Sequence, residues 1–248
     1  MEKSINVRGV DFNNESFDGI VSLLMSRLDE KKQTALFTPN SEIVQLCIDD
    51  NSLYEIINSG DVVIPDGIGV VKAAKILGTP FRYGKVAGIE VGAGILEKVS
   101  GTSHKVFLLG GKPGIAELAK EKLLLKHPGI VFAGTNDGYF KKEGEENDKI
   151  IEKINESGAD VLFVCLGAPA QEKWIYNNRS KLENVNLMMG LGGSLDGYAE
   201  TVKRAPRIFI KLGLEWFYRL LKEPKRIGRM MKLPKFYFGT ILYKLKKK

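Results

Sequence analysis

Short apolar runs alternate with amphipathic stretches along the second half of the chain. Strands are predicted at 106–109, 130–133, 161–166 and 187–189, and helices at 114–125, 149–156 and 171–182. Strands that alternate with helices pair in parallel through right-handed crossovers. The pattern therefore predicts an α/β fold, with a Rossmann-like parallel sheet and flanking helices.

The first half of the chain shows the same alternation in a less regular form. Its patterns predict a small hairpin at 5–13, strands at 34–37 and 61–67, and helices at 17–27, 43–47, 51–58, 68–77 and 89–99. Sequential strands are neighbours about two-thirds of the time. We therefore expect residues 38–40 and Asp66 to meet at the carboxyl ends of two paired strands.

Asp66 is the first candidate for chemistry. It follows the apolar run 61–65 and precedes Gly67, where the backbone turns into a helix. Ligands of open α/β sheets bind at the carboxyl ends of strands. The alternative is that Asp66 only caps the following helix. Thr38 and Asn40 occupy the corresponding place after the preceding strand, and helix capping alone would also explain Asn40.

Turns rich in Gly and Pro follow the later strands. Gly110 and Gly111 open a turn whose backbone N–H groups would face a phosphate, although its spacing lacks the full G-x-G-x-x-G pattern and also suits a tight connection. Asp137 would hold a ribose hydroxyl or simply form an Asp-Gly turn. Candidates for ligand contact in the remaining loops are Lys85, Gly167, Pro169, Gln171 and Glu172. For Glu172, ordinary helix-dipole stabilisation is the alternative.

Composition restricts the class of protein. With 248 residues, 44% of them hydrophobic, the chain can bury a full core without disulfides. Cys47 and Cys165 lie in apolar segments and lack metal-ligand spacing, which suits a reducing compartment. The sequence shows neither a signal peptide nor an apolar run long enough to span a membrane. We therefore expect an intracellular protein that is not integral to a membrane.

Charge divides the chain into two parts. Residues 201–248 contain 15 Lys and Arg but only two Glu, whereas residues 1–200 are acidic overall. The domains expected are an α/β catalytic core at 1–200, whose 105–190 part is the Rossmann-like nucleotide-sugar half, and a basic, amphipathic, helical appendage at 201–248. So basic an appendage implies an anionic partner, and its interleaved aromatic residues favour an anionic membrane surface. The alternative is a docking helix that completes the core.

Several motifs, taken together, resemble the WecG/TagA/CpsF glycosyltransferase family. They are Thr38-Pro39-Asn40, Pro65-Asp66-Gly67, the turn at 109–114, the segment 167–172 and the stretch 204–229. They follow the family's order over most of the chain, and the last stretch is the most specific.

The resemblance implies an inverting, metal-independent transfer without cofactors. N-acetylmannosamine would pass from its UDP-activated form to the N-acetylglucosamine of a polyprenyl-diphosphate lipid, in wall teichoic acid linkage-unit synthesis. Asp66 resembles the family's general base, and Thr38, Asn40 and Gln171 match positions that line the sugar pocket. The sequence contains no Asp-x-Asp pair for a divalent ion. The candidates to clamp the UDP diphosphate are therefore Arg219, Arg226 and Arg229.

Other functions remain open from the residues alone. A different UDP-sugar would use the same machinery, and an NAD-dependent oxidoreductase would share the alternating strands and the Gly110 turn but would leave the basic appendage unexplained. A regulatory module tethered to nucleic acid or membrane is the non-enzymatic alternative. We expect no nucleic-acid partner, a cytoplasmic enzyme peripheral to the inner face of the plasma membrane, and a homo-oligomer that dissociates at the membrane.

Overall fold

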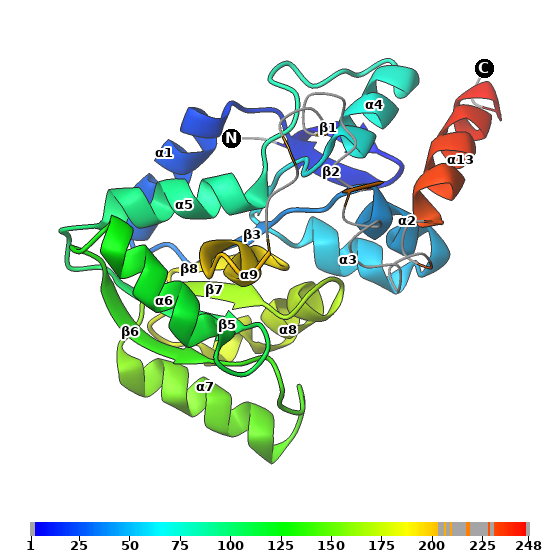
Figure 1. The fold of residues 1–248 in the computed structure, drawn as a ribbon. Coiled ribbons are helices and arrows are strands. Elements are labelled where there is room, and N and C mark those ends of the chain that lie inside the picture. Colours follow the sequence, from blue (N-terminus) through cyan, green and yellow to red (C-terminus); the bar gives the residue numbers. More distant parts are fainter. Residues whose placement is uncertain are drawn as a thin grey trace.

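A six-stranded parallel sheet forms the centre of the protein in the computed structural model, which describes residues 3–202, 206, 209, 217, 218, 228 and 231–246. The strand order is β4-β3-β8-β7-β5-β6 (Figure 1). These strands are β3 (Thr34–Phe37), β4 (Val62–Val63), β5 (Lys105–Gly110), β6 (Val131–Asn136), β7 (Val161–Cys165) and β8 (Leu187–Gly190). Every pairing among them is parallel, which confirms the Rossmann-like arrangement expected from the sequence.

Helices cover both faces of this sheet (Figure 1). The helices on one face are α1 (Phe17–Asp29), α5 (Gly88–Val99), α6 (Ile115–Lys126) and α9 (Ser194–Tyr198). The other face carries α7 (Glu145–Ser157) and α8 (Ala170–Asn178), the latter extended by a 3₁₀ turn at Arg179–Lys181. Both faces of the central strands are therefore buried, whereas the edge strand β6 is only partly buried.

The central strands are apolar on both sides. In β5, Val106 and Leu108 face the α1/α5/α6/α9 layer, whereas Phe107 and Leu109 face α7 and α8, and all four are fully buried. When helices cover both faces of a parallel sheet, each strand appears in the sequence as a continuous apolar run rather than as an alternating pattern. That is why the sequence revealed these strands as short apolar blocks.

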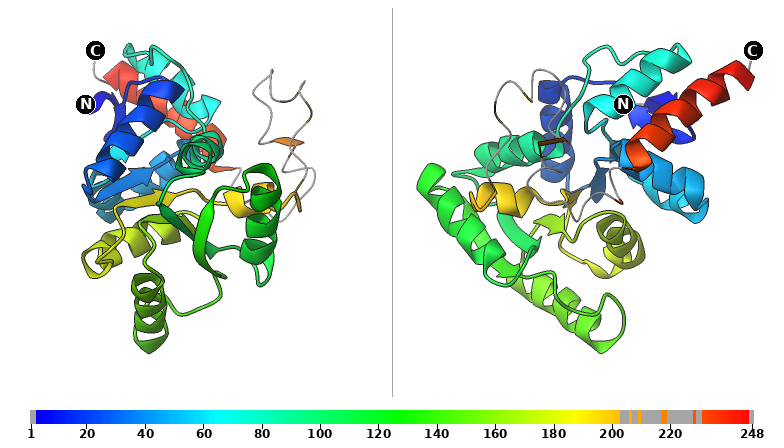
Figure 2. Two further views of the ribbon diagram at one scale, coloured as in Figure 1. Left: turned by 90° about the vertical axis from the view of Figure 1, so that its left-hand side faces the viewer. Right: turned by 45° about the vertical axis from the view of Figure 1, so that its right-hand side comes forward.

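A second apolar cluster lies beside the sheet. It joins the hairpin of β1 (Lys3–Val7) and β2 (Val10–Asn13) to α2 (Ser41–Asp49), α3 (Ser52–Asn58), α4 (Ile68–Leu77) and α13 (Lys232–Lys246). Helix α13 packs against α2 and α4, with Phe236 1% exposed in the contact (Figure 2). Lys235 bonds Asp49 at 2.7 Å, and the Arg8 guanidinium lies 4.7 Å above the Tyr243 ring.

Strand β4 is shorter than the expected 61–67. Asp61, the first residue of that run, forms ion pairs with Arg27 at 3.0 Å and Arg179 at 3.2 Å instead of extending the strand. The Ile64 amide still donates to the Phe37 carbonyl, but Pro65 has no N–H to continue the ladder. The strand therefore ends just before Asp66.

A histidine bridges two carboxylates at the amino edge of the sheet. His104 Nδ1 lies 2.5 Å from Asp160 and Nε2 lies 3.0 Å from Asp29. Burial by itself lowers the pKa of His104, but the hydrogen bonds to the two carboxylates outweigh it, and the net pKa is raised. Asp160 also accepts from the Lys105 amide at 2.8 Å, so this cluster fixes the start of β5.

We predict that His104 makes stability depend on pH. Because its folded pKa is raised, its contribution is complete below about pH 6.5, the unfolded value, and is lost as pH rises through the folded pKa. Denaturant unfolding at pH 6 and pH 9 should show a larger loss of unfolding free energy for the wild type than for His104→Gln. Equal losses in the two proteins would contradict the prediction.

Candidate active site

The carboxyl ends of the six strands bring most of the predicted residues to one edge of the sheet. Thr38 and Asn40 follow β3, Asp66 follows β4, and Gly110 ends β5. The expected neighbourhood of 38–40 and Asp66 is confirmed, because β3 pairs with β4 and the Asp66 amide lies 3.4 Å from the Pro39 carbonyl.

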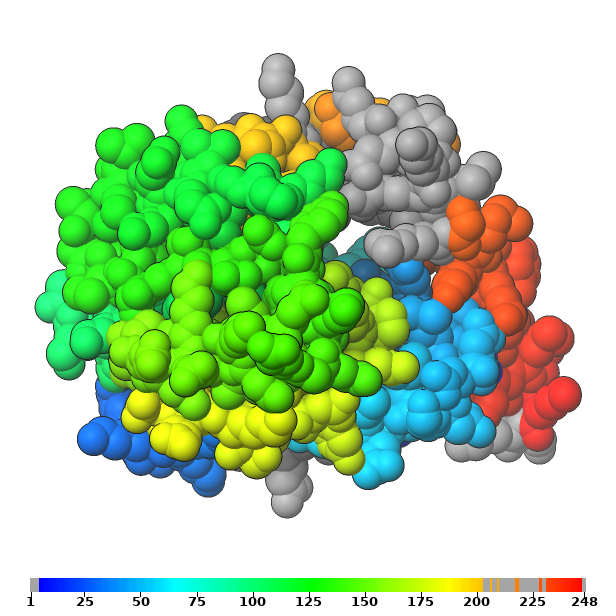
Figure 3. All heavy atoms as spheres, turned by 90° about the horizontal axis from the view of Figure 1, so that it is seen from below, coloured from blue at the N-terminus to red at the C-terminus, as the bar shows by residue number. Residues whose placement is uncertain are grey.

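The topology also opens a crevice at this edge. The adjacent strands β5 and β7 are followed by α6 and α8, which lie on opposite faces of the sheet. Ligands of doubly wound folds bind at such a switch point. Seen from below, the surface shows a gap between the green part of the chain and the blue part (Figure 3).

Asp66 does not occupy the N-cap position of the next helix. That position belongs to Gly67, whose φ of 98° suits glycine. Asp66 is half-buried one residue earlier. The Val86 amide donates to the Pro65 carbonyl at 3.0 Å, so the loop that carries Lys85 is fixed beside Asp66. Asp66 therefore lies outside the N-cap position, and the loop that carries Lys85 lies next to it in the fold.

Thr38 connects three elements. Its hydroxyl donates to the Gly190 carbonyl at 3.0 Å, which ties the end of β3 to the end of β8. Gly88, the first residue of α5, packs so closely that a β-carbon there would lie 2.8 Å from Thr38 Cγ2. Asn40 caps α2 as the alternative reading proposed, since its Oδ1 accepts from the Glu42 and Ile43 amides at 2.9 and 3.1 Å. Only the side-chain oxygen of Asn40 serves that cap.

Gln171 and Glu172 lie beneath this edge rather than on it. Gln171 is 2% exposed, and its Oε1 accepts from the Gly192 amide at 2.8 Å while its Nε2 donates to Glu172 Oε1 at 2.9 Å. Glu172 is fully buried, and burial raises its pKa to about 7 despite the hydrogen bond from Gln171. Among the described residues its Oε2 has no hydrogen-bond partner. The sequence did not indicate that this carboxyl group would be buried.

The glycine turn at 110–111 serves a close backbone approach, whereas a β-carbon on Gly167 would meet nothing within 4 Å. A β-carbon on Gly110, whose φ is 130°, would lie 2.3 Å from the Cys165 carbonyl oxygen. Gly111 donates to the same carbonyl at 3.2 Å. Gly167 accepts from the Gln171 amide at 2.9 Å, and Pro169, which follows a cis peptide bond, accepts from the Lys173 amide at 3.1 Å. These turns hold the ends of β5 and β7 together at the switch point.

Asp137 forms the turn that the alternative reading proposed. Its Oδ1 accepts from the Tyr139 amide at 2.7 Å. The next residue, Gly138, donates to the Gly111 carbonyl at 2.9 Å, which places Asp137 beside the Gly110 turn. Lys142 holds this loop by donating to the Gly138 carbonyl at 2.7 Å. Sequence reasoning missed Lys142, because nothing distinguishes it from the neighbouring surface lysines.

Three of the predicted residues, Arg219, Arg226 and Arg229, lie outside the described residues, as does most of the helix expected at 207–222. The described part of the chain nowhere gathers three or more His, Cys, Asp or Glu side chains in a group that could hold a metal ion. Within that part, no helix is both long and apolar enough to cross a membrane.

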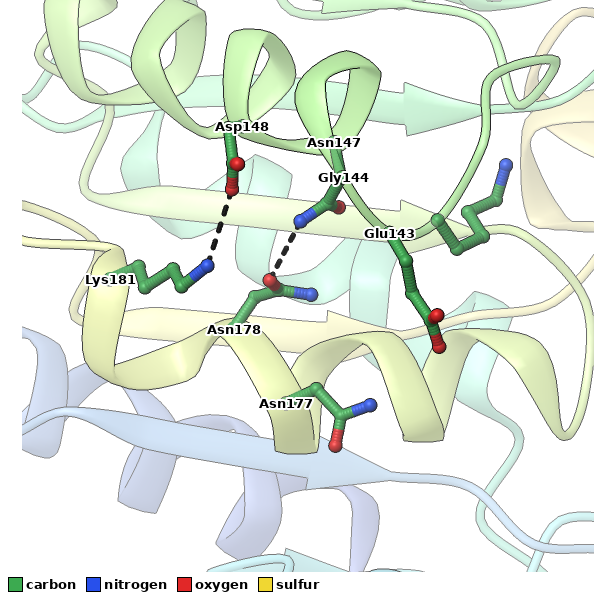
Figure 4. Close-up of a pocket in the computed structure, with 8 residues that line it drawn as sticks. Glu143, Gly144, Asn147, Asp148, Asn177, Asn178 and Lys181 are labelled. Carbon is green, nitrogen blue, oxygen red and sulfur yellow. Dashed lines mark hydrogen bonds and ion pairs between the residues drawn. The ribbon is translucent and has the colours of Figure 1, made fainter.

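A separate polar cavity of about 260 Å³ lies between the start of α7 and the end of α8 (Figure 4). Its walls are made of paired groups: Asn147 donates to Asn178 at 2.9 Å, and Lys181 bonds Asp148 at 3.2 Å. Asn147 also accepts from the Trp174 indole at 2.6 Å. This cavity is lined by the loop 142–144 and by residues of the helical segments on either side of it, and includes none of the strand-end residues.

Comparison with known proteins now adds to this geometry. A family model described as "Glycosyl transferase WecG/TagA/CpsF family" matches residues 5–248. The chain belongs to the WecG/TagA/CpsF family. Curated relatives named N-acetylglucosaminyldiphosphoundecaprenol N-acetyl-beta-D-mannosaminyltransferase occur in Bacillus spizizenii, 35% identical over 95% of this chain and 90% of the relative, and in Staphylococcus aureus strain MW2, 36% identical over 94% and 91%.

Membership in the WecG/TagA/CpsF family confirms the resemblance found in the motifs and makes the protein a glycosyltransferase. The family's motifs at 38–40 and 65–67 are the ones that the fold brings together after β3 and β4. The motif at 167–172 contributes buried support, since Gln171 and Glu172 are both within it.

We predict that Glu172 lowers the stability of this WecG/TagA/CpsF family member as pH rises. The folded pKa of about 7 lies above the ordinary 4.5, so the folded state holds the proton longer than the unfolded chain. The free energy of unfolding should therefore fall between about pH 4.5 and 7, by a few kcal/mol at most, since one pKa unit corresponds to about 1.4 kcal/mol.

Glu172→Gln removes this titration while keeping the shape of the side chain. Urea unfolding at pH 5 and pH 8 should show a smaller loss of stability for Glu172→Gln than for the wild type. An identical pH dependence in both proteins would show that Glu172 does not titrate in this range.

Proposed function

We propose that the protein transfers N-acetylmannosamine from UDP-N-acetylmannosamine to the N-acetylglucosamine of undecaprenyl-diphosphate-N-acetylglucosamine, with inversion and without a metal ion. The relatives in Bacillus spizizenii and Staphylococcus aureus bear the name of this transfer and align with about nine-tenths of the chain. The observation that carries the proposal is the position of Asp66 beside Thr38 and Asn40 at the carboxyl edge. This transfer belongs to wall teichoic acid synthesis.

Asp66 would act as the general base. The acceptor hydroxyl loses its proton to the Asp66 carboxylate as its oxygen forms a bond to the anomeric carbon, while the bond from that carbon to the UDP oxygen breaks on the opposite face. General-base assistance of this kind is typically worth about 10² to 10⁴ in rate. Thr38 and the Asn40 amide would supply neutral hydrogen-bonding groups for the sugar hydroxyl and acetamido groups. Gln171, which is buried, would support this pocket from beneath.

The donor nucleotide would lie across the switch point. Gly110 and Gly111 bring backbone groups next to β7, and Asp137 stands beside them within reach of a ribose. Lys85, next to Asp66 in the fold, is a cation for the diphosphate, and Arg219, Arg226 and Arg229 would complete the charge as UDP departs. Cationic side chains would thus replace a divalent ion, consistent with a sequence that has no Asp-x-Asp pair.

We predict that Asp66→Asn folds but loses about 10²-fold or more of its transfer rate, because an amide cannot accept the hydroxyl proton. The measurement is transfer from UDP-N-acetylmannosamine to a soluble lipid-linked acceptor analogue, run with and without EDTA. Asp148→Asn, on the surface of α7, is the matched control and should keep full activity.

Wild-type turnover in Asp66→Asn would contradict the base assignment. Loss of wild-type activity in EDTA would contradict metal independence. Transfer of another UDP-sugar at a higher kcat/KM would contradict the proposed donor sugar but not the proposed mechanism. Reduction of NAD with no transfer would overturn the proposed function altogether.

We further propose that the enzyme is peripheral to the cytoplasmic face of the plasma membrane, where the lipid-linked acceptor would be found. Helix α13 supports this, because its docked face, with Phe236 and Thr240, is buried against the core and its opposite face is apolar but exposed. That exposed stripe, at helical spacing, consists of Met231, Phe238, Leu242 and Leu245. Exposed lysines flank it, as on helices that lie in a membrane interface.

We predict that Phe238→Ser combined with Leu242→Ser weakens binding to vesicles of anionic lipid by tenfold or more, since burying each side chain is worth about 1.5 to 3 kcal/mol. Co-sedimentation with the vesicles measures the change. Leu125→Ser, on α6, is the control, because Leu125 is 80% exposed but lies outside the stripe. Equal vesicle binding by the wild type, the double variant and Leu125→Ser would show that the exposed stripe does not contact the membrane.

A further inference from the structure

The buried carboxyl group of Glu172 has no explanation in the stability of the fold. Its side chain is fully buried in the first turn of α8, and among described residues no cation forms an ion pair with it. Burial, and after it the charge of Glu172, raise the pKa of the Cys47 thiol on α2 to about 12, so this neighbour supplies no positive charge. An unpartnered, buried polar oxygen costs free energy of folding. A non-polar residue of the same length would be the more stable choice.

The hydrogen bond that Glu172 does form fixes the orientation of a neighbour. Glu172 Oε1 accepts from Gln171 Nε2 at 2.9 Å, either as a carboxylate oxygen or as the carbonyl oxygen of the protonated acid. Gln171 therefore turns its Oε1 toward the Gly192 amide, 2.8 Å away. If the amide were flipped, the Gln171 oxygen would face the Glu172 carboxylate and its nitrogen would face an N–H group.

The orientation of the Gln171 amide affects the strand ends through one segment, residues 190–192. Gly190 lies against Gln171, because a β-carbon there would be 3.1 Å from Gln171 Nε2. The Gly190 carbonyl accepts from Thr38 Oγ1 at 3.0 Å, and the Gly192 amide is held by Gln171. Hydrogen bonds at the two ends of segment 190–192 thus link Glu172, through Gln171 and this backbone segment, to Thr38, next to the position of Asp66.

We propose that Glu172 is a positioning residue: it locks the Gln171 amide in one orientation and thereby holds segment 190–192 in place under Thr38 for sugar binding. The effect on catalysis rests on the proposed function, whereas the effect on segment 190–192 does not. A residue that positions another contributes nothing once the other is removed, and a double-mutant cycle measures this.

The experiment compares Glu172→Met, Gln171→Met and the double variant with the wild type. Both single variants should lose at least tenfold in kcat/KM of sugar transfer, and the double variant should be no worse than Gln171→Met alone. Glu172→Gln retains an acceptor oxygen and should recover part of the activity lost in Glu172→Met. Tyr176→Phe, which removes an exposed bond to Glu55 from the same helix, should leave kcat/KM unchanged.

Two measurements are independent of activity. Hydrogen exchange should be faster in segment 190–192 of Glu172→Met than in the wild type, and the melting temperature of Glu172→Met should be equal or higher. Slow exchange in that segment, additive losses in the double variant, or unfolding of Glu172→Met would each overturn the inference. Absence of transfer in the wild type would count against the proposed function alone, because the exchange result would still decide the positioning of 190–192.

Discussion

Parallel pairing of all six strands is the constraint on which the rest of the structure depends. It sends every strand toward the same edge, and helices close both faces, so polar groups that must meet a ligand are confined to the loops at that edge. Thr38, Asp66 and Gly190 come from segments far apart in the sequence but lie at the ends of three neighbouring strands. The charged groups at the amino edge are instead paired with one another, since Asp61 and His104 are held there in ion pairs.

Much of this arrangement was predictable because periodicity and pairing rules act locally. The alternating apolar blocks after residue 105 indicated the parallel sheet, and the two strands before Thr38 and Asp66 were expected to be neighbours, as they are. The sequence could not predict how deeply individual side chains would be buried. Gln171 and Glu172 stand one position apart in a first turn, and only tertiary packing decides that both are buried.

The roles of turn residues were also left open by the sequence. Asn40 and Asp137 each satisfy backbone amides, as capping and turn propensities predict, and the sequence offered this reading together with the functional one. Asp66 differs from these two residues, because Gly67 and not Asp66 occupies the N-cap position of α4. One glycine with a positive φ thus holds the N-cap position of α4, and Asp66 lies just before it. No composition or charge count could have made that distinction.

The Arg8 and Phe236 contacts have a consequence for biosynthesis. The hairpin of β1 and β2 is made first, yet the apolar cluster it belongs to also requires Phe236 of α13, and the Arg8 guanidinium rests on Tyr243. Until residues 232–246 have left the ribosome, the surfaces of α2 and α4 that α13 covers stay open to solvent and to other chains. Completion of this cluster therefore waits for the synthesis of residues 232–246, and a nascent chain arrested before α13 presents an aggregation-prone face.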